Sequence, residues 1–529
     1  MLRTEYDVNL TAAIAVIAVP CCPTMPRFSV RRLLVTLIFV SLTLVLFFSA
    51  HILLYGQHAQ LAALQHQHQH QHQRTTTTTT TNSNSCRYNM ISNCTSSITS
   101  SSSSGTRGHG HVDLVRYWSV VADCFPPAPP LKLAKGGSKF VVFQPDLGGW
   151  NNIRMALEVV ILFALVTQRV LVLPPDSVLY LLSKNKKWGD NFSNMDDYFN
   201  FDHLRDQGKG GGGIRTMSMP EFLDLIRQDP SYWLEHYNSS TTLPSRDATK
   251  QPLWDFLENT CYWRQWQPGK TFLTFGPYLP GWNETSRYRR HSMNYKRIAV
   301  PYETTFADKP VVYFAGHDRN RMLTLFYGYL YMAKDSLDLK VKRFVRDRMR
   351  YHDAIFCLGS KIVSLLPSNY VAFHIRRGDF QHKHTQLAAE QILKNVLGLV
   401  PKGINDAYIS TDEKDKTFFA PFFRRFGNVY FLSNFTKEVG LGSIDQNYLG
   451  MIEQVVCASA HTFFGTPLST FTGYISRIRG YKNTTSATRG IYSRTYYFMP
   501  KHMHQLHEKP NLALPFWPRE FVQAFEGLT

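Results

Sequence analysis

Residues 139–173 carry the pattern that most constrains the fold of this chain. An apolar strand candidate at 139–143 is followed by a turn at 144–149, an apolar helix candidate at 152–168 and a second strand candidate at 170–173. A helix of this length between two strands is the usual connection between parallel strands. The pattern therefore predicts a β-turn-α-β unit.

The turn of this unit has the composition of a ligand-binding loop. Gly148 and Gly149 allow the backbone to approach a ligand closely, and Asn151 lies where a helix start offers unpaired N–H groups. Arg154, about one turn further along, can point back to the same mouth. The loop suits an anion or a sugar hydroxyl, although many α/β folds turn in this way without a ligand.

The second half of the chain contains a strand that ends in concentrated charge. Residues 339–366 read as largely helical and lead into an apolar strand at 370–375. At its end stand four polar side chains: His374, Arg376, Arg377 and Asp379. Ligands of open α/β sheets gather at the carboxyl ends of strands, so this set is placed for chemistry.

Further strands and helices follow in alternation. Strands are expected at 407–410 and 429–432, a helix at 448–459, a last strand at 461–464 and a helix running to Arg479. Asp412 follows the first of these strands, and Ser469 and Thr470 are expected to cap the final helix, where hydroxyl and N–H groups form a second anion site. The alternation predicts a mostly parallel, doubly wound α/β sheet in each half, with the active site in the cleft between the halves.

Length and charge set wider limits. A chain of 529 residues exceeds what one core usually supports, so two globular units with tails are expected. The 58 Lys and Arg against 39 Asp and Glu give a formal charge of +19. Such a charge suits nucleic acid, an acidic membrane surface, a phosphorylated cofactor or an acidic glycan.

An uncharged apolar run at 33–55 is long enough to span a bilayer as one helix. Arg27, Arg31 and Arg32 precede it, and no Lys or Arg follows until Arg74. The positive-inside rule then predicts a single-pass type II anchor with the body in the lumen, which disfavours nucleic acid as a partner. A late signal peptide is the alternative.

The segment after the anchor is low in complexity, with His/Gln, Thr and Ser runs typical of a disordered stalk. Six N-glycosylation sequons follow the anchor, at Asn93, Asn191, Asn238, Asn283, Asn434 and Asn483. Four cysteines lie in the body, at positions 124, 261, 357 and 457, and no CxxC pair occurs. In an oxidising compartment they are expected to form disulfides, with three pairings open.

Four motifs occur together in the order and spacing of a known family. They are Gly148 to Arg154 (GGWNNIR), His374 to Phe380 (HIRRGDF), Thr411-Asp412, and Ser469 to Phe471 (STF). Over about 138–482 the chain resembles the GDP-fucose O-fucosyltransferases, especially their plant and algal type. The resemblance implies a GT-B-like fold with two Rossmann-type domains facing a cleft, an inverting mechanism, and GDP-fucose as donor.

The resemblance also implies roles for individual residues. Arg376 is expected to bind the diphosphate and assist its departure, with His374 beside it, and Asn151 to lie by the reacting sugar. The implied donor-binding set is Gly148, Gly149, Arg154, His374, Asp379, Asp412, Ser469, Thr470 and Phe471. Some members carry a catalytic Glu where this chain has Gly148, so the nearest carboxylate, Asp146, is the expected base. The acidic guanine-binding residue of some animal members has no counterpart before the strand at 461–464.

No Asp-x-Asp triplet occurs in the sequence. A metal-dependent sugar-nucleotide transferase would normally need such carboxylates to hold Mn²⁺ or Mg²⁺. We therefore expect no metal and no cofactor other than the donor substrate, with Arg376 and a helix start stabilising the leaving diphosphate.

The predicted organisation has six parts: a cytosolic tail (1–32), the transmembrane anchor (33–55), a disordered stalk (56–135), an N-terminal α/β domain with the Gly-rich loop (136–335), a C-terminal nucleotide-sugar-binding domain (336–500) and a C-terminal tail (501–529). The predicted activity is transfer of fucose to a protein or glycan hydroxyl in the Golgi or endoplasmic reticulum. Two alternatives stay open: a transferase using UDP-rhamnose on polysaccharide, and a catalytically silent carbohydrate-binding membrane protein.

Overall fold

The computed structural model describes residues 115, 117, 137–145, 148–175, 195–199, 201–204, 213–248, 251–262, 271–274, 288–290, 293–295, 298–301, 306–316, 335–483, 490–504 and 506. All of them belong to the unit Cys86–Thr529. The predicted anchor at 33–55, the cytosolic tail and nearly all of the stalk lie outside the described residues, and so does the base candidate Asp146.

The first sheet is entirely parallel, as expected. It has the order β3-β2-β1-β8, with β1 at Phe140–Phe143, β2 at Val170–Leu173, β3 at Thr216–Ser218 and β8 at Val311–Phe314. Every side chain of β1 and β8 is buried because helices or other segments cover both faces. The strands expected at 139–143 and 170–173 are confirmed.

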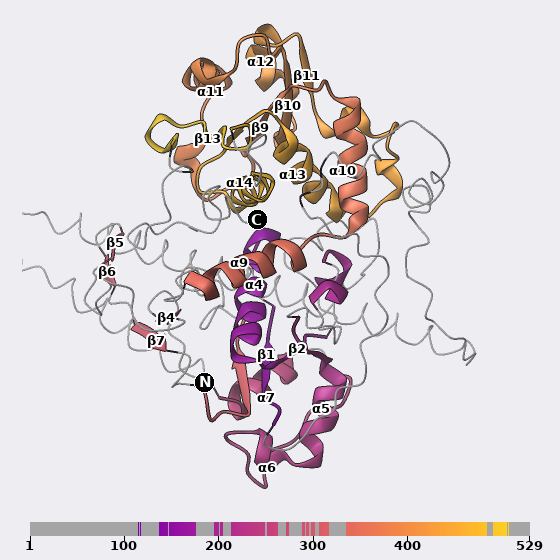
Figure 1. Ribbon diagram of the computed structural model, residues 1–529, viewed down its shortest axis with the longest axis vertical. Helices are drawn as coiled ribbons and strands as arrows, with labels where there is room; N and C mark the ends of the chain where they lie inside the picture. The colour runs from indigo at the N-terminus through magenta and orange to yellow at the C-terminus, as the bar shows by residue number, and fades with distance from the viewer. Residues whose placement is uncertain are drawn as a thin grey trace, which may run out of the picture. The chain divides into compact units, whose positions relative to one another are not determined.

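Helix α4 (Trp150–Thr167) connects β1 to β2 and starts two residues earlier than expected (Figure 1). It begins after Gly149 and ends at Thr167, and the next residue, Gln168, has a left-handed backbone (φ 56°) and caps the last turn through its N–H. Among the described helices, α4 alone is long and apolar enough to cross a membrane. Most of α4 is buried inside the protein, and a central core helix can have the same length and apolar composition as a membrane span.

The rest of the first half was hard to read from the sequence. It contains η3 (Met195–Asp197), η4 (Phe201–Leu204), α5 (Met219–Gln228), α6 (Pro230–Trp233) and α7 (Gln251–Thr260). A parallel pair, β4 (Thr271–Thr274) and β7 (Ile298–Pro301), accompanies an antiparallel pair, β5 (Tyr288–Arg290) and β6 (Met293–Tyr295). Helix α5 starts at a full capping box, in which Ser218 and Glu221 bond each other's backbone N–H.

The second sheet is also parallel and has five strands in the order β11-β10-β9-β12-β13. Its strands are β9 (Val371–Ile375), β10 (Asp406–Thr411), β11 (Asn428–Tyr430), β12 (Thr462–Gly465) and β13 (Thr495–Tyr497). The fully buried β9 lies between β10 and β12. The strand expected at 461–464 is confirmed as β12, but it is not the last strand, because β13 adds a further parallel strand.

The helices of the second half are α9 (Asp335–Arg348), α10 (Asp353–Leu365), α11 (Ala389–Val396), α12 (Ala420–Arg425), α13 (Leu449–Ser459) and α14 (Thr470–Lys482). Short 3₁₀ turns join them: η6 (Lys383–Thr385), η7 (Leu397–Leu399), η8 (Lys416–Phe419), η9 (Leu432–Phe435), η10 (Leu441–Ser443), η11 (Gln446–Tyr448) and η12 (Pro500–His502). The segment 339–366, expected to be largely helical, forms the two helices α9 and α10, and Tyr351 between them forms a bridge with Phe199.

A buried ion network joins α4 to α14. Glu158 accepts from Arg154 Nη1 at 2.7 Å and from Arg477 Nη1 at 2.6 and 2.7 Å. All three side chains are at most 1% exposed. Buried charges are tolerated only when paired, so this network fixes the register between the two helices.

The expected disulfide pattern needs correction. Cys261 and Cys457 are free and buried, whereas Cys357 is disulfide-bonded. Two disulfides among the four body cysteines are therefore excluded. Both free thiols lie in apolar surroundings, and burial raises the pKa of Cys261 to about 12.

Candidate active site

The turn that follows β9 is clamped by side chains from both neighbouring strands. Thr466, just after β12, donates its hydroxyl to the His374 carbonyl (2.8 Å) and accepts the Arg376 N–H (3.0 Å). Asp412, just after β10, accepts the Arg377 N–H (2.7 Å). The parallel register brings these ends together, so the two arginines leave the strand from a fixed backbone.

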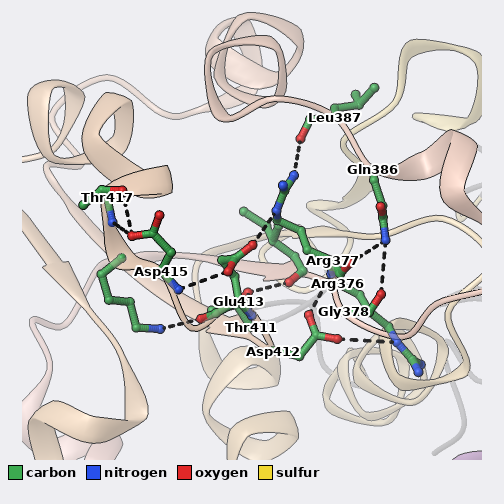
Figure 2. A network of polar contacts seen from close by, with 12 residues as sticks. Arg376, Arg377, Gly378, Gln386, Leu387, Thr411, Asp412, Glu413, Asp415 and Thr417 are labelled. Atoms are coloured by element: carbon green, nitrogen blue, oxygen red, sulfur yellow. Dashed lines mark hydrogen bonds and ion pairs between the residues drawn. The ribbon is translucent and has the colours of Figure 1, made fainter.

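The side chains of the two arginines point to different surroundings (Figure 2). Arg377 Nε donates to Glu413 at 2.8 Å, its Nη1 donates to the Leu387 carbonyl, and its guanidinium lies 3.9 Å from the Phe418 ring centroid. The bond from Arg377 lowers the pKa of the Glu413 carboxyl. The positive charge of Arg377 is thus paired with a carboxylate of the protein itself.

Arg376 is held more loosely. Its Nη2 donates to the Asp379 carbonyl at 3.2 Å, and its Nε is 3.9 Å from Asp412 Oδ2, too long for a hydrogen bond. Its guanidinium lies 4.7 Å from the Phe380 ring centroid, and one third of the side chain is exposed. The side chain of Arg376 is therefore accessible to an anionic ligand.

His374 is buried beside this arginine. Its ring stacks on Phe471 with a centroid separation of 4.4 Å, and its Nδ1 lies 2.7 Å from Thr472 Oγ1. Burial, and next the charge of Arg376, lower the pKa of His374 to about 3. The imidazole is therefore neutral near pH 7, with the nitrogen that faces Thr472 already engaged.

Gly465 makes room for that contact. A Cβ at Gly465 would lie 2.2 Å from Thr472 Cγ2 and 2.8 Å from its hydroxyl oxygen. No residue but glycine fits there unless Thr472 moves. The glycine at the end of β12 is thus part of the support of His374.

The start of α14 carries an orphan hydroxyl. Ser469 is the N-cap residue, as predicted, but its side chain makes no capping bond. Its Oγ is buried and has no hydrogen-bond partner among the described residues. Leu468 before it has a left-handed backbone (φ 62°), which is uncommon for a leucine. A buried polar atom without a partner at a helix start is what an absent ligand would leave.

The Gly-rich turn places Asn151 in the first turn of α4, where it is 6% exposed. Asn151 Oδ1 accepts from Gln454 Nε2 (3.2 Å) and from Arg154 Nε (3.4 Å). Arg154 does not open toward the mouth of the loop as the sequence suggested. It is fully buried, lies 3.9 Å from the Tyr474 ring centroid and pairs with Glu158.

Contacts connect the predicted site residues of the two halves. Gln454 Nε2 donates both to Asn151 and to the Phe471 carbonyl (3.3 Å), and Phe471 in turn stacks on His374. Gln454 was missed in the sequence, although a lone amide among the apolar residues of its helix is a usable signal. Thr466 and Thr472 were missed because short hydroxyl side chains carry no pattern of their own.

The described residues contain no group of three or more His, Cys, Asp or Glu side chains that could hold a metal ion. What the site offers instead is a part-exposed guanidinium and an orphan hydroxyl, both at the carboxyl ends of parallel strands. Such features are typical of the anion-binding sites of α/β enzymes that use nucleotides.

The model of one protein family, described as GDP-fucose protein O-fucosyltransferase, matches residues 140–482. The chain belongs to this family and is therefore a glycosyltransferase. The match includes Asn151, Arg376 and Ser469, and it confirms the resemblance seen in the four motifs.

Solved structures of fucosyltransferases are similar to this chain. POFUT1 in complex with GDP shares 14% identity over 69% of this chain and 99% of that chain, with a TM-score of 0.37. The fucosyltransferase NodZ from Bradyrhizobium shares 14% identity over 64% and 93%, with a TM-score of 0.32. No curated protein matches the chain.

Proposed function

We propose that this glycosyltransferase uses GDP-fucose and transfers fucose, with inversion, to a hydroxyl of a protein or glycan. The observation that carries the proposal is the position of Arg376: a clamped backbone holds a guanidinium that is one third exposed and whose ion pair with Asp412 Oδ2 is long, at 3.9 Å. Membership of the family supports fucose as the sugar and GDP as the nucleotide.

The reaction breaks the bond between fucose C1 and the β-phosphate oxygen, and that oxygen gains negative charge as it leaves. Arg376 can offer two N–H groups to phosphate oxygens, and its fixed backbone means that little reorganisation is needed. Ser469 Oγ and the start of α14 are suited to the remaining oxygens.

The acceptor hydroxyl forms the new bond to C1 from the opposite face, and its proton passes to a base. Asp146 is our proposed base, as the nearest carboxylate to the Gly-rich loop in the sequence. His374 is an unsuitable base near pH 7, since its lowered pKa makes it a weak proton acceptor. We assign His374 instead to support of the Arg376 turn.

The remaining donor-binding residues of the proposal are Gly148, Gly149, Asp379, Asp412, Thr470 and Phe471. Asp412 contributes by holding the turn after β9, since it accepts the Arg377 N–H. Phe471 contributes by stacking on His374, which lies beside Arg376. We also retain the GT-B-like arrangement of two domains around a cleft, and a mechanism without metal in which Arg376 supplies the positive charge.

The compartment is a proposal of its own: a type II membrane protein of the Golgi or endoplasmic reticulum with a luminal catalytic region. The arginines before the apolar run support the orientation. The disulfide at Cys357 supports an oxidising compartment.

The test is donor choice by the purified full chain. GDP-fucose and UDP-rhamnose are offered separately to protein and glycan acceptors in the presence of EDTA, and transfer is measured with labelled sugars. We expect transfer from GDP-fucose that free GDP inhibits and free UDP does not. Transfer from UDP-rhamnose alone would contradict GDP-fucose as the donor. Activity only after addition of Mn²⁺ would contradict the metal-free mechanism. Binding of a glycan without turnover would indicate a silent carbohydrate-binding protein.

A further inference from the structure

Gln454, on α13, is fully buried and uses every polar group of its side chain. Its Oε1 accepts from the Tyr351 hydroxyl at 2.8 Å. Its Nε2 donates to Asn151 Oδ1 at 3.2 Å and to the Phe471 carbonyl at 3.3 Å. One glutamine thus bonds both to the first turn of α4 in the first half and to the start of α14 in the second.

The chemistry of its neighbours fixes which way this amide points. The indole N–H of Trp150 can only donate, and it donates to the Tyr351 oxygen at 3.2 Å. The Phe471 carbonyl can only accept, so the amide atom 3.3 Å from it must be Nε2, and Oε1 is left to accept the proton of the Tyr351 hydroxyl. Because Oε1 faces Tyr351, Nε2 faces Asn151.

Asn151 is fixed by the same reasoning. A guanidinium can only donate, so the atom of Asn151 that lies 3.4 Å from Arg154 Nε must be its oxygen. Gln454 Nε2 donates to that same oxygen. With both donors directed at Oδ1, the side-chain nitrogen Nδ2 bonds no acceptor among the described residues.

We infer that Gln454 is a positioning residue that orients the Asn151 amide so that its N–H₂ group, and not its oxygen, is presented to the reacting sugar. This inference rests on the proposed function, in which Asn151 lies beside the donor. Asn151 then acts as a hydrogen-bond donor to an oxygen of the reactants. It cannot serve as the proton acceptor, because its oxygen is committed to Gln454 and Arg154.

The test is a double-mutant cycle in the full chain, with GDP release from GDP-fucose in the presence of acceptor as the assay. Gln454→Met keeps the length of the side chain but cannot donate. We expect kcat to fall roughly ten- to 100-fold, as when a partner that orients a functional group is lost. KM for GDP-fucose should change by less than about threefold, because the lost interaction acts in the transition state and not in the binding of the donor.

In the Asn151→Ala background, the same Gln454→Met change should lower kcat by less than about twofold, because its effect passes through Asn151.

Tyr370→Phe is the matched control. It removes another buried hydrogen bond to α13, from the Tyr370 hydroxyl to the Val456 carbonyl at 2.7 Å, without contact to Asn151. It should lower thermal stability and leave kcat unchanged. Equal losses in both backgrounds, or no loss from Gln454→Met, would overturn the inference.

Asn151→Asp decides the matter if Gln454→Met does not fold. An aspartate still accepts from Gln454 and Arg154 but has no N–H₂ group, so we expect its kcat to be as low as that of Asn151→Ala. Turnover close to wild type would show that the N–H₂ group is not needed. A wild-type chain that releases no GDP from GDP-fucose would instead refute the proposed function.

Discussion

At the scale of single residues, the site depends on which polar groups the protein leaves without a close partner. Arg377 is neutralised by Glu413 at 2.8 Å, whereas Arg376 has a carboxylate only at 3.9 Å. Ser469 Oγ is buried with no partner in the described part of the chain. Buried polar groups are usually hydrogen-bonded within the protein. The unpartnered Ser469 Oγ and the long ion pair of Arg376, at the ends of adjacent strands, therefore indicate a ligand site.

Ser469→Ala is expected to separate binding from stability. Removing a hydroxyl that has no partner should leave the free energy of unfolding within about 0.5 kcal/mol of wild type. A hydrogen bond to a charged phosphate contributes about 1.5–3 kcal/mol, so KM for the donor should rise roughly tenfold to 100-fold. Steady-state kinetics and denaturant unfolding measure the two effects.

Ser476→Ala is the control for that experiment. Its hydroxyl is buried but donates to the Thr472 carbonyl at 3.0 Å. Its loss should cost about 1 kcal/mol of stability with little change in KM. The reverse pattern, in which Ser469→Ala unfolds the protein and donor binding is unaffected, would remove Ser469 from the donor site.

His374 should make the protein sensitive to acid. Its pKa is about 3 in the folded protein and near 6.5 when exposed, so between these values the unfolded chain binds the extra proton. Its contribution to stability is full above pH 6.5 and falls by up to about 1.4 kcal/mol per pH unit below it. From pH 7.5 to pH 5.0, wild type should lose about 2 kcal/mol more than His374→Gln. The measurement is the free energy of unfolding in urea at the two pH values. Equal losses in wild type and His374→Gln would contradict this.

At the scale of elements, the sequence predicted those whose pattern is locally complete. Strands β1, β2 and β9 are apolar runs, and α4 and α14 begin close to the expected residues because glycine, serine or threonine marks their starts. The break between α9 and α10 was not predicted. The helical pattern continues through it, and the bridge between Tyr351 and Phe199 that interrupts it joins residues far apart in the sequence.

Gly465→Ala tests the contact between β12 and α14. The added Cβ would lie 2.2 Å from Thr472 Cγ2, so α14 or Thr472 must shift. We expect a loss of about 1–3 kcal/mol in the free energy of unfolding. Turnover should also fall, because the bond from Thr472 to His374 is disturbed.

The control is Gly398→Ala, since a Cβ at Gly398 meets nothing within 4 Å. Its stability should stay within about 1 kcal/mol of wild type, with turnover unchanged. If Gly465→Ala is as stable and active as Gly398→Ala, the packing described for β12 and α14 is wrong.

At the scale of the whole molecule, the sequence predicted the class of the fold and most of the candidate site. The strand-end motif and the Gly-rich turn were both visible as local patterns. What joins them was not: Gln454, and the pairing of Glu158 with Arg477, connect positions about 300 residues apart and leave no local signal. Arg154 was misplaced for the same reason, because its partners could not be read from neighbouring residues.

The proposed luminal location predicts a selective pattern of glycosylation. Asn238 and Asn434 are exposed, whereas Asn483 is fully buried and donates to Ser493 Oγ at 2.9 Å. In a secretory host, Asn238→Gln and Asn434→Gln should each remove one glycan-dependent shift in electrophoretic mobility, and Asn483→Gln none. Loss of a glycan from Asn483→Gln would contradict the buried position of Asn483. An unglycosylated chain would contradict the location.

The most direct measurement of the central claim is the release of GDP from GDP-fucose by wild type, Arg376→Ala and Arg377→Ala, with acceptor present and folding checked by thermal unfolding. Arg376→Ala should lose roughly 10²- to 10³-fold in turnover, as when a preorganised donor to a developing charge is removed. Arg377→Ala loses its pairing with Glu413 and should show the smaller kinetic effect. A folded Arg376→Ala protein with near-normal turnover, beside an inactive Arg377→Ala, would contradict the assignment of the diphosphate to Arg376.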